Sequence, residues 1–406
     1  MNTYISLAWR NLWRNKKRTL IASASVFFAV LLALLMRSMQ HGYYNYMIDA
    51  SVRMYTGYIQ VHGKNYWEKK SLDESMQLDN KHITELKNTP GVTLTVPRFE
   101  TYSLISYGNK TKVVQVTGIN PELENELTNL KKKIVSGNYL SDSSKGIIIA
   151  QGLAEILKVQ VGDSVVIYGQ GYHGVTAAAQ IPITGIVKFT IPELNKTFTY
   201  LSLPYTQWLF SAPGRLTSLS IMIDNPKNID DIKANIRKIF NSNYEVMDWA
   251  ELSPELVQSI QIDNAGGIIM LAILYIVIAF GIFGTIMMMT AERVKEFGIL
   301  ISVGMKKWKL GLVTFFETIF VSLLGVFSGV IISIPVLLYL KAHPIPLTGE
   351  YAQAILAFGY EPILPFAVNP GIFFAQIWVV LSIAIVTAIY PILYIRKLQA
   401  VEALRG

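Results

Sequence analysis

The side chains most used in enzyme chemistry are sparse and scattered in this sequence. None of the 406 residues is cysteine, which excludes disulfides and thiol nucleophiles. The five histidines show no metal-ligand spacing: His41, His62, His82, His173 and His343. We therefore expect no catalytic residue and no metal site.

One glycine-rich stretch, GQGYHG (residues 169–174), matches the pattern of dinucleotide-binding loops after a strand-like run. In such loops a helix follows, and its N-terminus meets the pyrophosphate. Here Pro182 and a second strand-like run follow instead, so we predict a hairpin loop. The sequence also contains no G-x-x-x-x-G-K-[ST] phosphate loop.

Glu317 is the one acidic residue well inside an apolar stretch, about two helical turns from its basic end. Acids inside a membrane span are functional candidates. Alternatively, Glu317 lies near the interface and pairs with a lysine, and the sequence leaves both interpretations open. In the same stretch Gly325 and Gly329 form G-x-x-x-G, which predicts close helix packing.

The segment AERVKEFGILISVGMKKWKLG (residues 291–311) has the pattern of a short amphipathic helix between two apolar runs. Its apolar face carries Val294, Phe297 and Ile301, and its polar face carries Glu292, Lys295 and Glu296. Ile299 and Val303 fall on the polar side, which a helix lying on lipid would keep polar. The pattern favours a protein partner slightly over a helix resting on the membrane.

The composition places these features in a membrane. The chain is 51% hydrophobic and 16% charged, whereas soluble domains are about 25% charged. The apolar excess lies in four runs, each of which approaches or exceeds the roughly 20 residues that span a bilayer. They are residues 20–36, 266–289, 310–340 and 371–395.

Basic residues indicate the orientation of these spans. They gather before the first span, between the second and third, and after the fourth: Arg10, Arg14, Lys16, Lys17, Arg18; Arg293, Lys295, Lys306, Lys307, Lys309; Arg396, Lys397, Arg405. Both termini and the 290–309 loop are thus expected in the cytoplasm, and the large domain outside it. This bias explains most of the net charge of +8, which therefore does not indicate nucleic acid.

The predicted fold is an α-helical membrane protein with four transmembrane helices, arranged one plus three, and a large extracytoplasmic α+β domain between helices 1 and 2. In order, we expect an amphipathic N-terminal segment (1–19), the first span (20–40), the α+β domain with stalk helices (41–265), the second span (266–289), a cytoplasmic loop (290–309), the third span (310–340), a short outer loop (341–370), the fourth span (371–395) and a cytoplasmic tail (396–406).

Three segments resemble a known family. ERVKEFGILISVGMKKWKLG resembles the signature of FtsX-like permeases, the ABC-transporter membrane subunits that include MacB-type exporters and lipoprotein-releasing (Lol) transporters. That signature, E-R-x-x-E-(I/F)-G-(I/L)-L-x-x-(I/V/L)-G, falls on Glu292, Arg293, Glu296, Phe297, Gly298, Ile299, Leu300, Val303 and Gly304. SLAWRNLWRNKKRTL is similar to the family's opening. The ending is similar to the family's (D/N)PVEALR, with Ala400 for the usual proline, at Val401, Glu402, Ala403, Leu404 and Arg405.

The resemblance implies that the amphipathic loop is a coupling helix docked on a separate cytoplasmic ATPase dimer, which binds ATP and Mg²⁺. This chain would bind no cofactor itself. It would pair with a second permease, either a copy or a relative, and transmit ATP-driven motion to its outer domain, a mechanism called mechanotransmission. Glu292, Arg293 and Glu296 are assigned polar contacts to the ATPase. Phe297, Ile299, Leu300 and Val303 would fill its groove, and Gly298 and Gly304 would permit close approach.

The cargo implied by the resemblance is a lipoprotein released from the inner membrane, with a periplasmic carrier as a further candidate partner. Separate permeases of about this length suit that branch, as does MYTGYIQVHG (residues 54–63). The acyl chains would enter between the first two spans, beside Met36, Met39, Tyr43, Ile268 and Leu271. MacB-type export of peptides or drugs is the alternative.

Two other classes of membrane protein account less well for the loop. A membrane-anchored receptor would carry a cytoplasmic output domain, and the cytoplasmic segments here are short. A secondary transporter would show repeats, broken helices and more polar groups within its spans.

We predict that Glu296→Lys abolishes association with the ATPase while leaving membrane insertion intact. Reversing this charge would repel a basic partner surface. Co-purification of the tagged variant from membranes tests this, and a wild-type ratio of ATPase to permease would contradict the assigned role.

Overall fold

The computed structural model describes residues 2–14, 16–357 and 360–399. The chain forms two compact units. We call the first the bundle; it comprises Met1–Asn45, Ser259–Pro346 and Ile363–Gly406. We call the second the ectodomain; it comprises Tyr46–Gln258 and Leu347–Pro362.

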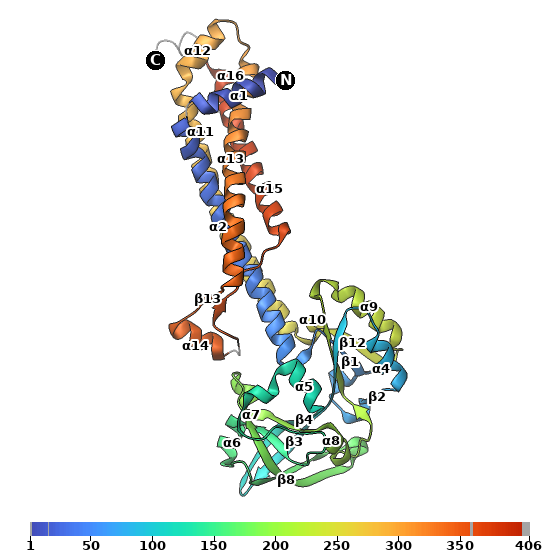
Figure 1. Ribbon diagram of the computed structural model, residues 1–406. Helices are drawn as coiled ribbons and strands as arrows, with labels where there is room; N and C mark the ends of the chain where they lie inside the picture. The colour runs from blue at the N-terminus through green and yellow to red at the C-terminus, as the bar shows by residue number, and fades with distance from the viewer. Residues whose placement is uncertain (1, 15, 358–359, 400–406) are drawn as a thin grey trace. The chain divides into compact units, whose positions relative to one another are not determined.

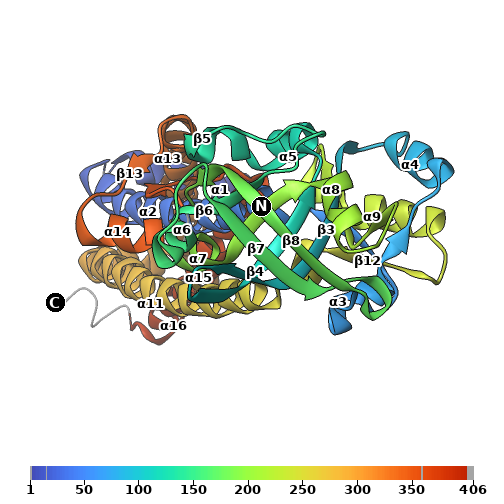
Figure 2. The ribbon, with the colours of Figure 1, turned by 90° about the horizontal axis from the view of Figure 1, so that it is seen from below.

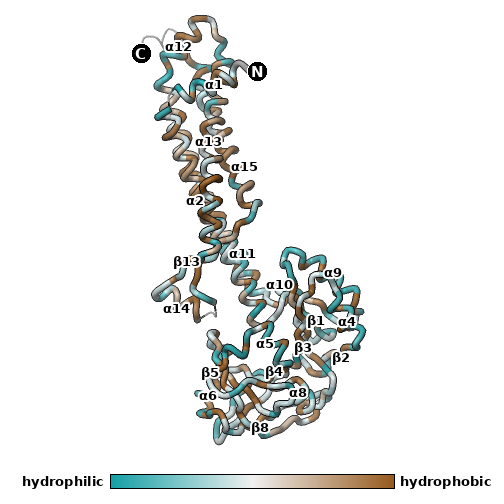
Figure 3. Tube along the Cα trace, viewed as in Figure 1, coloured by the Kyte–Doolittle hydropathy of each residue, from teal (hydrophilic) through white to brown (hydrophobic). Residues whose placement is uncertain are grey.

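Within the described residues, four helical segments are long and apolar enough to cross a membrane, which confirms the predicted number. They are α2 (Lys16–Ser51), α11 (Pro254–Glu292), α13 (Lys307–Ala342) and α15 (Pro370–Thr387), the last continued by α16 (Ile389–Lys397). In the bundle these helices run side by side (Figure 1), and their apolar character stands out along their length (Figure 3).

The first two of these helices are much longer than a span requires. α2 has 36 residues and α11 has 39, so each is over 50 Å long at 1.5 Å per residue, against a hydrocarbon core of about 30 Å. α2 then passes into a π-helical turn, η1 (Val52–Thr56), and α11 begins directly after Ser253. Parts of both helices must therefore lie outside the hydrocarbon.

The bundle core combines side chains from all four helices, including Val30 of α2, Ile282 of α11, Val326 of α13 and Val380 of α15. A shorter helix, α1 (Asn2–Arg14), packs through Leu12 against Ala22 and Val321. The remaining bundle elements are α12 (Val294–Ser302) and the antiparallel pair β13 (Ile345–Pro346) and β14 (Ile363–Leu364).

Gly325 and Gly329 lie where α13 meets α2. A Cβ atom at Gly325 would lie 2.5 Å from Cβ of Val26 and 2.7 Å from the carbonyl oxygen of Ser23. At Gly329 it would lie 3.0 Å from Cβ of Val30. The two backbones approach at a distance that only glycine allows, as small-xxx-small packing requires.

The ectodomain contains a ten-stranded sheet. Its order is β12 (Tyr244–Asp248), β1 (Ile59–Gly63), β11 (Ser218–Ile223), β3 (Val92–Tyr107), β4 (Lys110–Ile119), β9 (Phe198–Ser202), β6 (Ile147–Ala150), β8 (Thr176–Val187) and β5 (Ile134–Gly137). The tenth strand, β7 (Ser164–Gln170), pairs with both β3 and β8, so the strands from β3 to β8 close into a ring. Figure 2 shows β7 and β8 side by side.

Short helices and turns connect these strands. They are α3 (Tyr66–Lys69), η2 (Leu72–Glu74), α4 (Asn80–Lys87), α5 (Pro121–Thr128), η3 (Leu130–Lys133), α6 (Gln151–Leu157), η4 (Tyr172–Gly174), α7 (Pro192–Thr197), α8 (Leu203–Leu209), η5 (Pro226–Asn228) and α9 (Ile229–Ile239). After the last strand, α10 (Trp249–Leu252) leads to α11, and α14 (Gly349–Ala357) lies between β13 and β14. A two-stranded ribbon joins β2 (Met76–Gln77) to β10 (Arg215–Leu216).

The long strand β3 belongs to two hydrophobic cores. Ile105, in its second half, joins the core of the ring, and Val96, in its first half, joins a core completed by α4 and α9. The GQGYHG stretch forms the turn of the β7–β8 hairpin, where Gln170 pairs with Thr176, which confirms the predicted hairpin and leaves no following helix for a dinucleotide.

We predict that Gly325→Ala lowers the thermal stability of the purified chain, because the added methyl group forces α13 away from α2. Overpacking of this kind costs about 1–3 kcal/mol. The control is Gly281→Ala on α11, where a Cβ would meet no atom within 4 Å. If both variants had the same melting temperature in detergent, close α2–α13 packing would not limit the thermal stability of the chain.

Candidate functional site

The loop between α11 and α13 folds into the short helix α12. Arg293 stands at its N-cap, and the helix ends where Gly304 adopts a φ of +102°. The Gly304 amide donates to the carbonyl of Ile301 at 3.0 Å, and the Met305 amide donates to that of Leu300 at 2.9 Å. A left-handed residue at this place is the usual glycine stop.

The inner face of α12 is already occupied by the chain itself. Phe297 is only 1% exposed and packs against Leu310 of α13 and Ile395 of α16. Leu300 contacts the same cluster, and Gly298 is buried. These three members of the predicted ATPase-coupling set therefore hold α12 on the bundle.

The outer face of α12 presents apolar side chains. Ile299 is 53% exposed and Val303 is 82% exposed. Glu292 and Glu296 are exposed as well, and a Cβ at Gly304 would meet no atom within 4 Å. Of the predicted coupling residues, Ile299 and Val303 are the apolar ones that remain available to a partner.

Five polar side chains meet where α12 adjoins α1 and α13: Asn11, Arg14, Arg293, Glu296 and Glu317, here called the coupling cluster. Arg293, mostly buried, makes an ion pair with the buried Glu317 and lies 3.2 Å from a Glu296 oxygen. Asn11 donates to the other Glu317 oxygen at 2.7 Å, and Arg14 donates to both Glu296 oxygens at 2.8 Å.

The coupling cluster specifies the partner of Glu317. The sequence left it either functional or paired with a lysine, and the structure pairs it with an arginine from the loop. A planar guanidinium can contact two carboxylates at once, which a lysine does less well. Buried charges of this kind need their partners, so α12, α1 and α13 are tied together at this point.

The residues predicted for cargo access lie along α2 and α11. Met36, Met39 and Tyr43 are half-buried, Ile268 is exposed and Leu271 is buried. They do not share one environment.

Beside these residues the structure places polar contacts between α2 and α11 that the sequence did not predict. The Tyr44 hydroxyl donates to Asp263 at 2.6 Å, and Arg37 donates to Asn264 at 3.1 Å. A Cβ at Gly267 would lie 2.1 Å from the Gln40 amide nitrogen. The sequence contained one signal of these contacts: Arg37 and Asp263 are isolated charges at the ends of two apolar runs.

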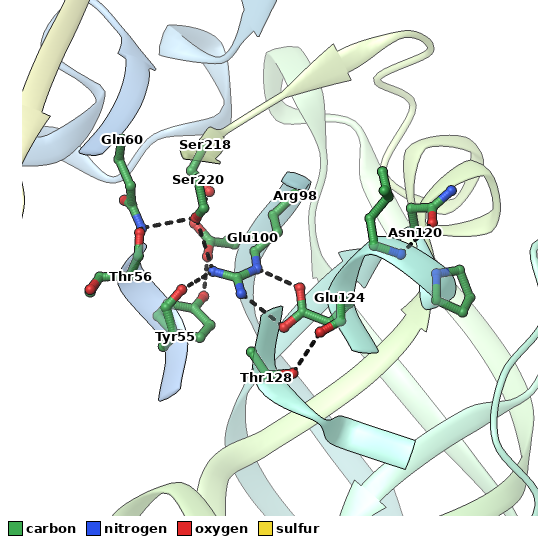
Figure 4. Close-up of polar contacts among 12 residues, drawn as sticks. Tyr55, Thr56, Gln60, Arg98, Glu100, Asn120, Glu124, Thr128, Ser218 and Ser220 are labelled. Atoms are coloured by element: carbon green, nitrogen blue, oxygen red, sulfur yellow. Dashed lines mark hydrogen bonds and ion pairs between the residues drawn. The ribbon is translucent and has the colours of Figure 1, made fainter. Parts of the chain in front are cut away.

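A second buried charge pair lies in the ectodomain (Figure 4). Arg98 of β3 and Glu124 of α5 are both fully buried and joined by two hydrogen bonds of 2.8 Å. Arg98 also donates to the backbone carbonyl of Tyr55 in η1 and to the Ser220 hydroxyl of β11 at 3.2 Å. The Tyr55 hydroxyl in turn donates to Glu100.

These contacts fasten the turn that ends α2 to the ectodomain sheet. One guanidinium connects η1, α5, β3 and β11, and it stacks over the Tyr55 ring at 4.3 Å. π-helical turns are found frequently at functional sites. A displacement of η1 would therefore act directly on the strands of this sheet.

Two family models match the chain. The MacB-like periplasmic core domain matches residues 19–239, more than half of the chain, and the FtsX-like permease C-terminal region matches residues 268–400. This chain is an FtsX-like ABC transporter permease. The match confirms the resemblance seen in the sequence, and the signature at residues 292–304 lies inside the matched region. The similar ending, Val401–Arg405, lies outside the residues that the structure describes.

Several known proteins resemble this permease. The lipoprotein-releasing system transmembrane protein LolC of Neisseria meningitidis is 21% identical, over 79% of each chain. An uncharacterized ABC transporter permease of Methanocaldococcus jannaschii is 22% identical, over 99% of this chain and 97% of its own. The solved periplasmic region of MacB from Actinobacillus actinomycetemcomitans is 12% identical, covers 50% of this chain and 92% of that region, and has a TM-score of 0.36.

Membership of this family has consequences for the site. Such permeases are membrane subunits of ABC transporters, so a partner ATPase supplies the energy, and the subunits are generally non-catalytic. The large domain between the first two spans is extracytoplasmic.

We predict that Glu317→Lys destabilises the permease, because it leaves Arg293 facing a second cation. Breaking a buried ion pair costs about 3–5 kcal/mol. The doubly exchanged variant, Arg293→Glu with Glu317→Lys, should recover part of the lost thermal stability in detergent. Equal melting temperatures of the single and double variants would show that the Arg293–Glu317 pair contributes little to thermal stability.

Proposed function

We propose that this permease works by mechanotransmission, converting ATP-driven movement of a cytoplasmic ATPase dimer into movement of its extracytoplasmic domain. The observation that carries the proposal is the coupling cluster. It joins α12 to α13 through Arg293 and Glu317 and to α1 through Asn11 and Arg14. A movement of α12 would therefore be transmitted to both of these helices.

The first step is docking of the ATPase on α12. Ile299 and Val303 form the exposed apolar contact, and Glu292 and Glu296 supply charge beside it. An amphipathic helix that lays its apolar side chains into a partner's groove is a recurring mode of protein recognition. ATP and Mg²⁺ are bound by the ATPase, and both termini of the permease lie in the cytoplasm.

The second step is movement of α2 and α11, which continue beyond the hydrocarbon. The Tyr44–Asp263 contact couples the two helices, and Arg98 couples the turn after α2 to the ectodomain sheet. Two permeases, identical or related, would move together, since the ATPase acts as a dimer.

The proposed cargo is a lipoprotein, released from the inner membrane and passed to a periplasmic carrier. The similarity to LolC along most of both chains supports this cargo. The acyl chains would enter beside Met36, Met39, Tyr43, Ile268 and Leu271, where the α2–α11 contacts would have to open. Export of peptides, antibiotics or other small molecules is the second candidate, supported by the match to the MacB-like core domain.

We predict that Val303→Asp abolishes association with the ATPase, because burying the new carboxylate against an apolar groove is costly. The matched control is Val135→Asp, an equivalent change at a 54% exposed valine of β5 in the ectodomain. Cross-linking, purification from native membranes and mass spectrometry measure the ATPase-to-permease ratio. Glu296→Lys is a less specific test, since Glu296 also binds Arg14 and Arg293 within the chain.

The same purification distinguishes the two cargo classes. Acylated lipoproteins accumulating with the wild-type complex when ATP hydrolysis is blocked would support lipoprotein release. A periplasmic adaptor without lipoproteins would favour export. A Val303→Asp variant that kept a stoichiometric ATPase would overturn the docking face.

A further inference from the structure

The ectodomain contains a pocket of about 290 Å³ that none of the functions above uses. Its walls come from the end of α2, from α5 and η3, from the segment after β8 with α7, and from Glu361, all within the ectodomain unit. Its size approaches the range of small-ligand sites.

The pocket carries an excess of positive charge. Arg53, Lys133 and Lys188 line it, against the single acid Glu361. Arg53 is paired with Asp49 at 2.9 Å. Among the described residues, neither lysine has a carboxylate within 4.0 Å, although Glu361 lines the same pocket.

Lys133 is the more enclosed of the two lysines. Its side chain is half-buried, and its ammonium group lies 5.8 Å from the centre of the Phe189 ring. Burial lowers the pKa of Lys133, and the charge of Glu124 offsets this effect only in part, so the site removes more hydration from the cation than its own carboxylates replace. An anionic ligand would restore that lost interaction.

The floor of the pocket is apolar. We give the name apolar floor to the five larger apolar side chains that line the pocket: Met54, Leu127, Phe189, Ile191 and Leu194. A small inorganic anion would leave this surface unused, whereas an anion that carries an apolar portion would cover it.

The position along α2 favours a lipid. Tyr46, which lines the pocket, stands about 9 Å beyond residue 40, the end of the first predicted span, on one unbroken helix. Headgroups occupy the layer just outside the hydrocarbon core.

We propose that this pocket binds the phosphate headgroup of an anionic membrane phospholipid, with Lys133 and Lys188 on the phosphate and the glycerol and upper acyl carbons on the apolar floor. This site is separate from the ATPase-docking face and from cargo access, so it holds whether or not mechanotransmission is correct.

The test measures lipid binding to the full-length permease in neutral detergent by native mass spectrometry. The probes are dioleoyl phosphatidylglycerol, dioleoyl phosphatidylcholine and inorganic phosphate. The double variant Lys133→Gln/Lys188→Gln should weaken the tightest phosphatidylglycerol site about tenfold, as expected for loss of charge-assisted contacts. The matched control is Lys131→Gln/Lys132→Gln, which removes the same charge from exposed residues of η3 outside the pocket.

The outcomes separate the possibilities. Loss of phosphatidylglycerol binding in the pocket variant alone, with little binding of phosphatidylcholine, supports the proposal. Equal loss in both double variants would show that lipid binding depends on surface charge in general and not on this pocket, and would overturn the proposal. Inorganic phosphate binding as tightly as the lipid would overturn the lipid assignment. Should the double variant melt earlier, Lys188→Gln alone, at an exposed position, must still show an intermediate loss.

Discussion

A carboxylate within an apolar helix is the constraint around which the bundle is arranged. Glu317 cannot remain charged among aliphatic side chains without partners, and Arg293 and Asn11 provide them from two other elements. Satisfying this one acid positions α1 across the bundle and turns the N-terminus of α12 inward. Phe297 then packs beneath the same helix. The apolar residues left outside, Ile299 and Val303, stay exposed because of where the charge pair holds the helix.

The ectodomain applies the same solution at a different place. Arg98 and Glu124 are fully buried, and they persist because each satisfies the other while the remaining guanidinium donors reach Tyr55 and Ser220. Replacing such a pair by apolar residues often costs little stability, so the pair is better understood as fixing geometry. The pair fixes the attachment of η1 to the sheet. Through this attachment the proposed movement of α2 would reach the strands.

Together with the Tyr44–Asp263 contact, these pairs are polar contacts between separate elements. Two of the three lie between apolar helices of the bundle, and the third lies within the ectodomain. Between helices in a membrane there is no hydrophobic driving force, because lipid and neighbouring side chains are equally apolar, so close packing and polar contacts hold the helices in place. Directional polar contacts resist sliding. A protein that transmits force needs such joints where force passes between elements, and apolar packing elsewhere. The described residues have this distribution, which is the basis of the mechanical coupling proposed above.

Local properties of the sequence determined the four spans, the turn at GQGYHG and the helix that ends at Gly304, because each depends on a contiguous apolar run or on the conformational freedom of glycine. The family signature at Glu292–Gly304 could also be recognised from the sequence, although the roles of its individual residues could not. Only the tertiary structure decided that Arg293 and Phe297 face inward, that β7 closes the strand ring, and that Arg98 meets Glu124 and Tyr55. Those contacts join residues from separate elements, and no local pattern specifies which distant charge a buried group will find; only the packing of the whole chain does.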